Sequence, residues 1–434
     1  MNMALISQKV TRDLIGRKTI KTLNEMKNLF FAGFITFLCI SCNRPYQLQE
    51  FEYTDKIDTN DHPINPQEKK RYVMMEEGVS ADNLFDAARM NNFSRLDKDK
   101  YEVLINPENS PINMSPWYAF RIYAETEKTV EVTLNYGQGR HRYWPKLSYD
   151  RNNWASVDSA NFKIADDSLS ATMTLVLSPD TLWVAAQEII NSSDMKNWVA
   201  TLPKDIAKTE VIGKTRLGRD LLSVEISNGE TKGKDIVVVL SRQHPPEVTG
   251  NLAMMAFLNE ITNGSPLSTE FLSKYSLAVY PMLNPDGVDL GHWRHNEGGI
   301  DLNRDWAYYR QPEVKQVCED IIRTVNAAGS TVALGLDFHS TWSDIYYIYD
   351  DTVKSSRQGF SRQWIQQIFD RVPEDQGEIS PFAVNSPVSK NWFYSQFNAE
   401  GITYEIGDAT PRDLIKEKGK VGAQEMIKIL LDKK

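Results

Sequence analysis

A histidine and a glutamate stand three residues apart at His244 and Glu247, with Pro245 and Pro246 between them. Imidazole nitrogen and carboxylate oxygen are zinc ligands, and a catalytic zinc site takes three protein ligands and leaves a position for water. The two prolines keep the residues before them extended, which excludes the helical H-E-x-x-H arrangement. With six histidines and 58 acidic residues in 434 positions, such a pair is expected about once by chance. The pair alone therefore does not establish a metal site.

Other titratable residues stand at the ends of apolar runs elsewhere in the sequence. VVVLS leads into His244, VALGLDF into His339 and ITY into Glu405. Unbroken apolar runs between helical segments predict an α/β domain with a mixed, mostly parallel sheet covered by helices, and ligands of such sheets bind where strands end. We therefore expect His339 to complete a three-ligand metal site with His244 and Glu247. Glu405 would then be free to act as general base on a bound water.

Several motifs follow one another along the chain: HPPE, NPDG, G-x-x-R, DLNRDW, FHS and a glutamate on a late strand. This ordered set resembles the zinc carboxypeptidase family, and PMLNPDGV followed by DLNR-x-W is most similar to its cytosolic-carboxypeptidase branch. The resemblance covers roughly residues 75–434. It implies a carboxypeptidase-like catalytic domain behind a β-rich domain, one Zn²⁺ per chain, and hydrolysis of C-terminal residues from peptides with a free C-terminus.

The same resemblance implies roles for individual residues between the metal ligands. Arg294, in GHWR, would stabilise the oxyanion that forms when the scissile carbonyl is attacked. Asn303 and Arg304 would bind the terminal carboxylate of the substrate, because a guanidinium matches that planar anion. Asp301 would accept a hydrogen bond from His244 on the side away from the metal.

Two residues ahead of Glu405 are candidates for substrate binding. Tyr394 could be the mobile tyrosine that closes over substrate in this family, although a core or helix-face tyrosine fits the sequence equally well. Lys390 could present a cation to an acidic terminal side chain, but a solvated helix lysine is the preferred interpretation. Asp337 is interpreted as a plain strand-end residue, and GRHRYW at residues 139–144 as a solvated hairpin end.

The chain ahead of the catalytic domain has a different pattern. Short strand-like runs recur between residues 72 and 202 with turn residues between them, as in KTVEVTLNY, where apolar and polar side chains alternate. Such runs predict an antiparallel, all-β sandwich domain at 72–202, followed by the catalytic domain at 203–434. Residues 43–71 are polar and charged without periodicity, which predicts a tether between a membrane anchor and the folded part.

Residues 1–42 predict a signal and lipobox region. The apolar run at residues 29–40 is too short to span a bilayer but has the length of a signal-peptide core, which we prefer to a buried core helix. It leads into Cys42 as in a bacterial lipoprotein signal, so cleavage before Cys42 would let its thiol take lipid. We therefore expect an exported protein that is anchored to the bacterial cell envelope. Only Cys318 would remain, on an apolar helix face, which excludes a disulfide framework.

The charge and the motifs also limit the alternatives. A net charge of −9 argues against nucleic acid as a partner, because that interaction needs clustered positive charge. Zinc hydrolysis could instead act on peptidoglycan stem peptides or on small acylated amino acids, and the β-rich domain favours a peptide or polymer. A non-catalytic binding protein on the same fold is the least favoured alternative, because no ligand or general base is missing.

Overall fold

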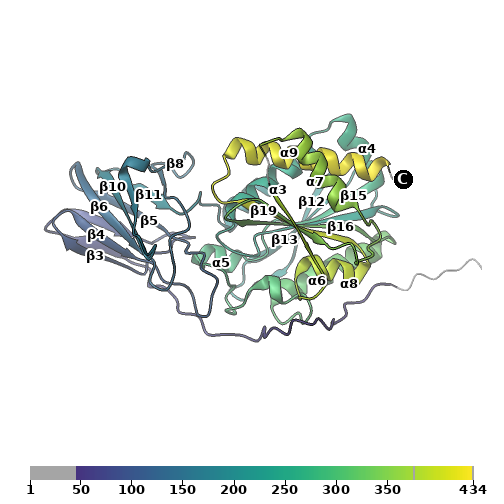
Figure 1. Ribbon diagram of the computed structural model, residues 1–434, viewed down its shortest axis with the longest axis horizontal. Helices are drawn as coiled ribbons and strands as arrows, with labels where there is room; N and C mark the ends of the chain where they lie inside the picture. The colour runs from purple at the N-terminus through teal and green to yellow at the C-terminus, as the bar shows by residue number, and fades with distance from the viewer. Residues whose placement is uncertain (1–44, 375–376, 433–434) are drawn as a thin grey trace, which may run out of the picture. The chain divides into compact units, whose positions relative to one another are not determined.

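The structure of the protein, a computed structural model, describes residues 45–374 and 377–432 (Figure 1). The predicted signal region at residues 1–42, with Cys42, lies outside the described residues. Within the two described ranges, no helix combines the length and the apolar character that crossing a membrane requires.

Two β-sheets that share one core form the N-terminal domain. One has the strand order β1-β2-β5-β11-β7-β8 and the other the order β3-β4-β6-β10-β9. Neighbouring strands are antiparallel, except that β4 and β6 run parallel. The prediction of an entirely antiparallel sandwich was wrong for this pair of strands. On β6, Val130, Val132 and Leu134 are buried and alternate with partly exposed polar residues, as the sequence pattern predicts. The strands are β1 (Arg71–Met74), β2 (Val79–Asp82), β3 (Asn92–Asp97), β4 (Lys100–Leu104), β5 (Ala119–Ala124), β6 (Lys128–Asn135), β7 (Lys146–Ser148), β8 (Ala155–Ser156), β9 (Phe162–Ile164), β10 (Ser170–Leu177) and β11 (Leu182–Ala185).

An eight-stranded mixed sheet lies at the centre of the catalytic domain. Its order is β12-β13-β15-β14-β16-β19-β17-β18, and the run from β15 to β19 is parallel, as is the edge pair β17 and β18. The strands are β12 (Ala207–Lys214), β13 (Asp220–Ile226), β14 (Asp235–Ser241), β15 (Tyr275–Tyr280), β16 (Val332–Thr341), β17 (Ile345–Tyr349), β18 (Glu378–Phe382) and β19 (Glu400–Gly407). All side chains of β15 and nearly all of β14 and β16 are buried, which explains their unbroken apolar sequences.

Helices cover both faces of this sheet, with α3, α7 and α9 on one face and α6 and α8 on the other (Figure 1). Met195 and Val199 of α2 belong to the core of the catalytic domain, so the packing of the catalytic domain begins before the predicted boundary at residue 203. The helices are α2 (Ser192–Val199), α3 (Val248–Ile261), α4 (Pro266–Lys274), α5 (Pro285–Leu290), α6 (Pro312–Ala328), α7 (Phe360–Arg371), α8 (Ser389–Phe397) and α9 (Arg412–Asp432), with short 3₁₀ turns η1 (Ser159–Asn161) and η2 (Leu302–Arg304).

The carboxyl ends of β14, β16 and β19 bring the predicted metal ligands and base to one place. His244 follows β14, and His339 near the end of β16 pairs in register with Glu405 on β19. Helix α3 begins directly after Glu247 and approaches β16 so closely that a Cβ at Gly250 would lie 2.2 Å from the carbonyl oxygen of His339. Glycine at position 250 therefore lets α3 pack against the strand that carries the third ligand.

Residues 47–70 differ from the predicted tether, because they pack along the catalytic domain with specific hydrogen bonds. The side chain of Thr59 is buried, and its Oγ1 donates to Asp305 Oδ1 at 2.7 Å. Gln311 Nε2 donates to the carbonyl oxygen of Thr59 at 3.0 Å, and Asp61 forms an ion pair with Arg216 at 2.6 Å. The polar composition of this segment predicted that it is solvated, whereas Thr59 and Asp61 form hydrogen bonds and an ion pair with the catalytic domain.

Candidate active site

Three ligand atoms converge in a buried cluster formed by His244, Glu247 and His339. Glu247 Oε1 lies 2.8 Å from His244 Nδ1, and Glu247 Oε2 lies 2.7 Å from His339 Nδ1. The two Nδ1 atoms are 3.2 Å apart. The sheet and the loop after β14 thus assemble the three residues that the sequence predicted as a metal site.

The spacing and chemistry of this cluster fit a zinc ion. Tetrahedral ligands with zinc bonds of about 2.0–2.1 Å lie about 3.3 Å from one another. The separations of 2.7–3.2 Å between the three ligand atoms approach that value, and two imidazoles with one carboxylate form a set typical of catalytic zinc. His244, Glu247 and His339 can therefore hold one Zn²⁺ and leave a fourth position for water.

A second carboxylate stands behind each histidine ligand. Asp301 Oδ1 lies 2.8 Å from His244 Nε2, which is the contact expected for this residue. Asp337 Oδ2 lies 2.9 Å from His339 Nε2 and also accepts a hydrogen bond from Gln243 Nε2 at 2.6 Å. Such partners fix the imidazole tautomer so that Nδ1 is left for the metal.

The interpretation of Asp337 as a plain strand-end residue was wrong. Residues two apart on a strand point to the same side, so an aspartate in the sequence Asp337-Phe338-His339 reaches the ring of the histidine. Ser389 at the start of α8 also donates its hydroxyl to Asp337, which ties the carboxylate to a second element. The D-x-H spacing was the signal that sequence reasoning could have used.

Glu405 is half-buried and lines the cavity beside the metal cluster. Its Oε2 has no hydrogen-bond partner among the described residues. Burial, together with the negative charge of Glu247, raises the pKa of Glu405 to about 8. A carboxyl group with one unpartnered oxygen and a raised pKa, next to a candidate metal site, suits a residue that exchanges protons.

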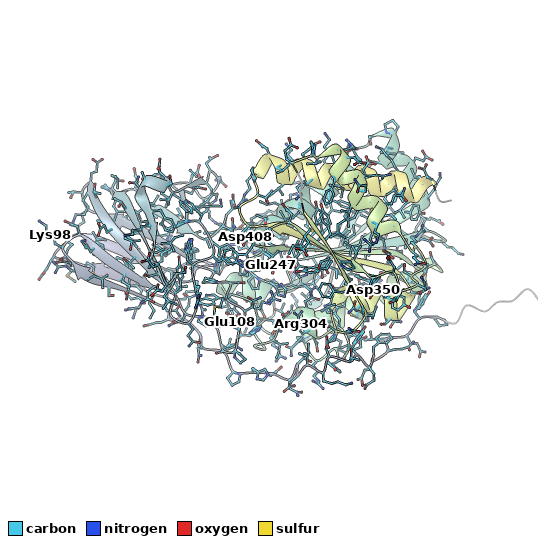
Figure 2. The ribbon with its side chains drawn as sticks, in the orientation of Figure 1. Lys98, Glu108, Glu247, Arg304, Asp350 and Asp408 are labelled. Atoms are coloured by element: carbon cyan, nitrogen blue, oxygen red, sulfur yellow. The ribbon has the colours of Figure 1, made fainter. Side chains whose placement is uncertain are left out.

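The three residues expected to bind substrate or oxyanion also reach this site. Arg294 donates from Nε and Nη2 to Asp301 Oδ2 at 3.0 and 2.8 Å, and its Nη1 lies 3.5 Å from Glu247 Oε1. Asn303 and Arg304 lie on η2, and Arg304 Nη1 donates to the backbone oxygen of Asn303 at 2.7 Å. Figure 2 shows the positions of Glu247 and Arg304 in the catalytic domain.

A cavity of about 550 Å³ opens onto the metal cluster. It is lined by charged and amide side chains from several parts of the chain, and the predicted residues among them are His244, Glu247, Arg294, Asn303, Arg304, His339, Lys390 and Glu405. The fold therefore brings the candidate ligands, base and substrate-binding residues into one continuous space.

Lys390 lines this cavity but is only 4% exposed, so its interpretation as a solvated helix lysine was wrong. Its Nζ lies 4.3 Å from the ring centroid of Tyr349 and donates to the carbonyl oxygen of Ile348 at 3.4 Å. Burial lowers the pKa of Lys390 to about 7, although Glu400 and Asp350 oppose this effect. A buried lysine that forms no ion pair with a carboxylate among the described residues suits an anionic ligand group.

Tyr394 does not belong to the residues that line the cavity within the described chain. Its ring instead packs against Tyr349, with 5.6 Å between centroids, which corresponds to the helix-face alternative. Tyr347 on β17 lines the cavity, and burial together with the charge of Glu405 raises its pKa. The tyrosine that lines the cavity is therefore Tyr347 on β17, the strand next to the one that carries Glu405, and the sequence analysis did not predict it.

Two further cavity residues come from segments to which the sequence assigned no site. Arg142, in the expected hairpin end, is buried and forms an ion pair with Asp408 at 2.8 Å. Its guanidinium also donates to the carbonyl oxygen of Ser340 at 3.3 Å. Asp55 lies in the expected tether, and its backbone N–H donates to Asn385 O at 3.0 Å. The interpretation of GRHRYW as a solvated hairpin end was therefore wrong for Arg142, whose side chain is only 5% exposed.

A buried cluster of two histidines and one glutamate, with a further carboxyl group beside it at the carboxyl edge of a mixed sheet, is an arrangement that can support metal-assisted hydrolysis. The zinc carboxypeptidase family model matches residues 194–420, which is more than half of the chain. The model of the cytosolic carboxypeptidase N-terminal domain matches residues 81–186. The chain therefore belongs to the zinc carboxypeptidase family, and the metal of that family, Zn²⁺, is the one that the ligand set fits.

Similar proteins include curated relatives from animals. Cytosolic carboxypeptidase 6 of Mus musculus is 20% identical over 334 residues, which cover 68% of this chain and 61% of the mouse protein. Cytosolic carboxypeptidase 2 of Danio rerio is 29% identical over 180 residues, which cover 39% of this chain and 24% of the zebrafish protein. The chain thus spans about three fifths of the length of the first relative and about a quarter of the second.

Solved structures share the fold. A putative carboxypeptidase A from Shewanella denitrificans has a TM-score of 0.68 at 21% identity, covering 81% of this chain and 99% of that one. A metallo-carboxypeptidase from Burkholderia cenocepacia has a TM-score of 0.67 at 20% identity, covering 81% and 98%. The predicted family and the predicted carboxypeptidase-like α/β fold behind a β-rich domain are confirmed.

Proposed function

We propose that this protein is a zinc-dependent carboxypeptidase that removes C-terminal residues from peptides. The observation that carries the proposal is the single cavity in which a His₂Glu metal cluster, Glu405 and three cationic or amide side chains meet. Each group needed for peptide hydrolysis and for recognition of a terminal carboxylate faces the same space.

Each residue of the site has a separate role in the proposed reaction. Zinc, when bound, supplies a Lewis acid and lowers the pKa of water. The carboxylate of Glu405 accepts a proton from the attacking water and later delivers it to the leaving amine. Arg294 donates to the oxygen of the scissile carbonyl as negative charge develops there. Asn303 and Arg304 bind the terminal carboxylate, which places the last peptide bond at the metal.

The test is a panel of peptides that end in acidic, basic, aromatic and small residues, together with a muropeptide and an acylated amino acid. The purified protein is incubated with and without a zinc chelator, and mass spectrometry identifies the products. Chelator-sensitive loss of single C-terminal residues is expected. Cleavage of the muropeptide alone would replace peptide trimming by cell-wall hydrolysis, and a zinc-loaded protein without any turnover would support a binding function.

Lys390 favours acidic terminal residues, because its buried Nζ can pair with a carboxylate in the cavity. Lys390→Met should lower kcat/KM for peptides ending in glutamate or aspartate by about 10- to 100-fold, since a hydrogen bond to a charged group contributes about 1.5–3 kcal/mol. Peptides with neutral ends should lose much less. Lys354→Met, which removes an exposed lysine bonded to the Asp351 carbonyl, is the matched control. Equal losses on acidic and neutral peptides would exclude this role.

The same side chain gives a pH dependence with a defined sign. Lys390 is a cation below its pKa, which burial lowers to about 7 in the free protein. The preference for acidic ends should therefore be largest at lower pH and decline as the pH rises past the pKa. A bound carboxylate raises the pKa of its partner lysine, so the decline in saturated enzyme should occur above pH 7. Lys390→Met should show no such decline.

We further propose that the protein is exported and anchored to the bacterial cell envelope by lipid on Cys42. The apolar run at residues 29–40 and the small residues before Cys42 support this proposal. Cells grown with labelled palmitate should yield labelled protein in the membrane fraction, and Cys42→Ser should abolish the label. A labelled Cys42→Ser protein, or an unlabelled native protein, would contradict the proposal.

A further inference from the structure

The loop that carries Arg294 is held by the β-sandwich domain. Glu108, between β4 and β5, has a fully buried side chain. Its carboxylate accepts hydrogen bonds from three consecutive backbone N–H groups, those of Trp293 at 2.7 Å, Arg294 at 3.0 Å and His295 at 2.7 Å. Figure 2 shows the place of Glu108 in the fold. Because three buried donors depend on this one carboxylate, it fixes the backbone on both sides of Arg294.

The two neighbours of Arg294 make further contacts with the sandwich. Trp293 is fully buried and belongs to the sandwich core, where a Cβ at Gly139 would lie 2.8 Å from its ring. His295 Nδ1 lies 2.6 Å from Asn109 Oδ1. Arg294 is therefore presented from a short segment that is held on both sides by the other domain.

Glu108 acts here as an anion. Burial would raise its pKa, but the charges of His292 and Arg89 and the backbone donors hold the pKa below its usual value. A carboxylate can accept hydrogen bonds through both oxygens, whereas an amide can accept through only one. Glutamine at position 108 would keep the volume of the side chain but leave at least one of the three donors without an acceptor.

We propose that Glu108 is a positioning residue, which holds the 293–295 backbone so that the Arg294 guanidinium reaches the developing oxyanion. This inference rests on the proposed function, because it assumes that Arg294 donates to that oxygen. Stabilisation of an oxyanion depends on donors that are placed before the reaction begins, and a small displacement of such a donor is costly. The sandwich domain thereby takes part in catalysis through a residue that does not touch the substrate.

Glu108→Gln in the full chain should lower kcat by about 10- to 100-fold with little change in KM, since the lost interaction is made only as charge develops. Zinc content, measured by metal analysis, should stay at the native level because no ligand is changed. Glu102→Gln, on β4 of the same domain with its carboxylate bonded to Asn135, is the matched control and should keep native kcat. A native kcat in Glu108→Gln would overturn the inference.

A double-mutant cycle with Arg294→Ala separates positioning from a structural role. If Glu108 acts through Arg294, Glu108→Gln should change kcat by less than about twofold once Arg294 is absent. An equal loss in both backgrounds would overturn the inference but leave the proposed function intact. A native kcat for Arg294→Ala alone would instead contradict the role of Arg294 in the proposed function. Should Glu108→Gln fail to fold, Asn109→Ala releases His295 from the same loop and enters the same cycle.

Discussion

Replacing Glu405 by glutamine is expected to lower kcat by about 10²- to 10⁴-fold while zinc stays bound, the range that a positioned general base contributes. The amide has the shape of the carboxylic acid but cannot accept a proton from water. Glu405 is not one of the three clustered ligands, so the change removes no metal contact. Steady-state kinetics on the preferred peptide, with metal analysis of the same sample, measure both quantities.

The pH profile gives the second readout for Glu405. Only the carboxylate form accepts a proton, so kcat should fall as the pH drops below the pKa of this group. Burial and the charge of Glu247 raise that pKa to about 8 in the protein without metal, and the positive charge of bound zinc lowers it again. The acid limb should therefore lie below pH 8 and disappear in Glu405→Gln. Glu225→Gln on β13, four strands away in the sheet, should keep both rate and profile.

Replacing His339 by alanine is expected to abolish measurable turnover by removing zinc. Loss of an outer hydrogen-bond partner of a zinc histidine costs about 10- to 100-fold in metal affinity, so loss of the ligand itself should cost more than about 100-fold. The variant also removes the His339 partner of the Asp337 carboxylate and of Glu247 Oε2, while Glu247 Oε1 keeps its contact with His244. Competition with a chromogenic chelator measures the affinity directly.

Thermal unfolding distinguishes zinc loss from general damage in His339→Ala. A metal that binds only the folded protein raises its unfolding temperature, so chelation should lower that of the native chain. Chelation should have no effect on His339→Ala. His62→Ala, which truncates an exposed histidine, should respond to chelator as the native chain does. Full zinc content and activity in His339→Ala would remove this residue from the metal site.

The sequence by itself determined the parts of this protein that depend on residue type and local pattern. Unbroken apolar runs predicted buried parallel strands, and the residues after them, His244, His339 and Glu405, lie together because strand ends share one edge of a sheet. The HPPE spacing, together with the residues at the other strand ends, predicted Glu247 as a partner of His244, and the family resemblance placed Asp301 behind that histidine. Alternating polarity on strands such as β6 likewise predicted the sandwich.

Only the tertiary structure decided which polar residues are buried and what they contact. Lys390 is polar in sequence but buried at the cavity, and Ser389 at the start of α8 donates its hydroxyl to Asp337 on β16. Arg142 and Glu108 come from the other domain, more than a hundred residues before the groups that they contact. Such contacts join segments that are far apart in the sequence, so no local pattern of charge or hydrophobicity encodes them.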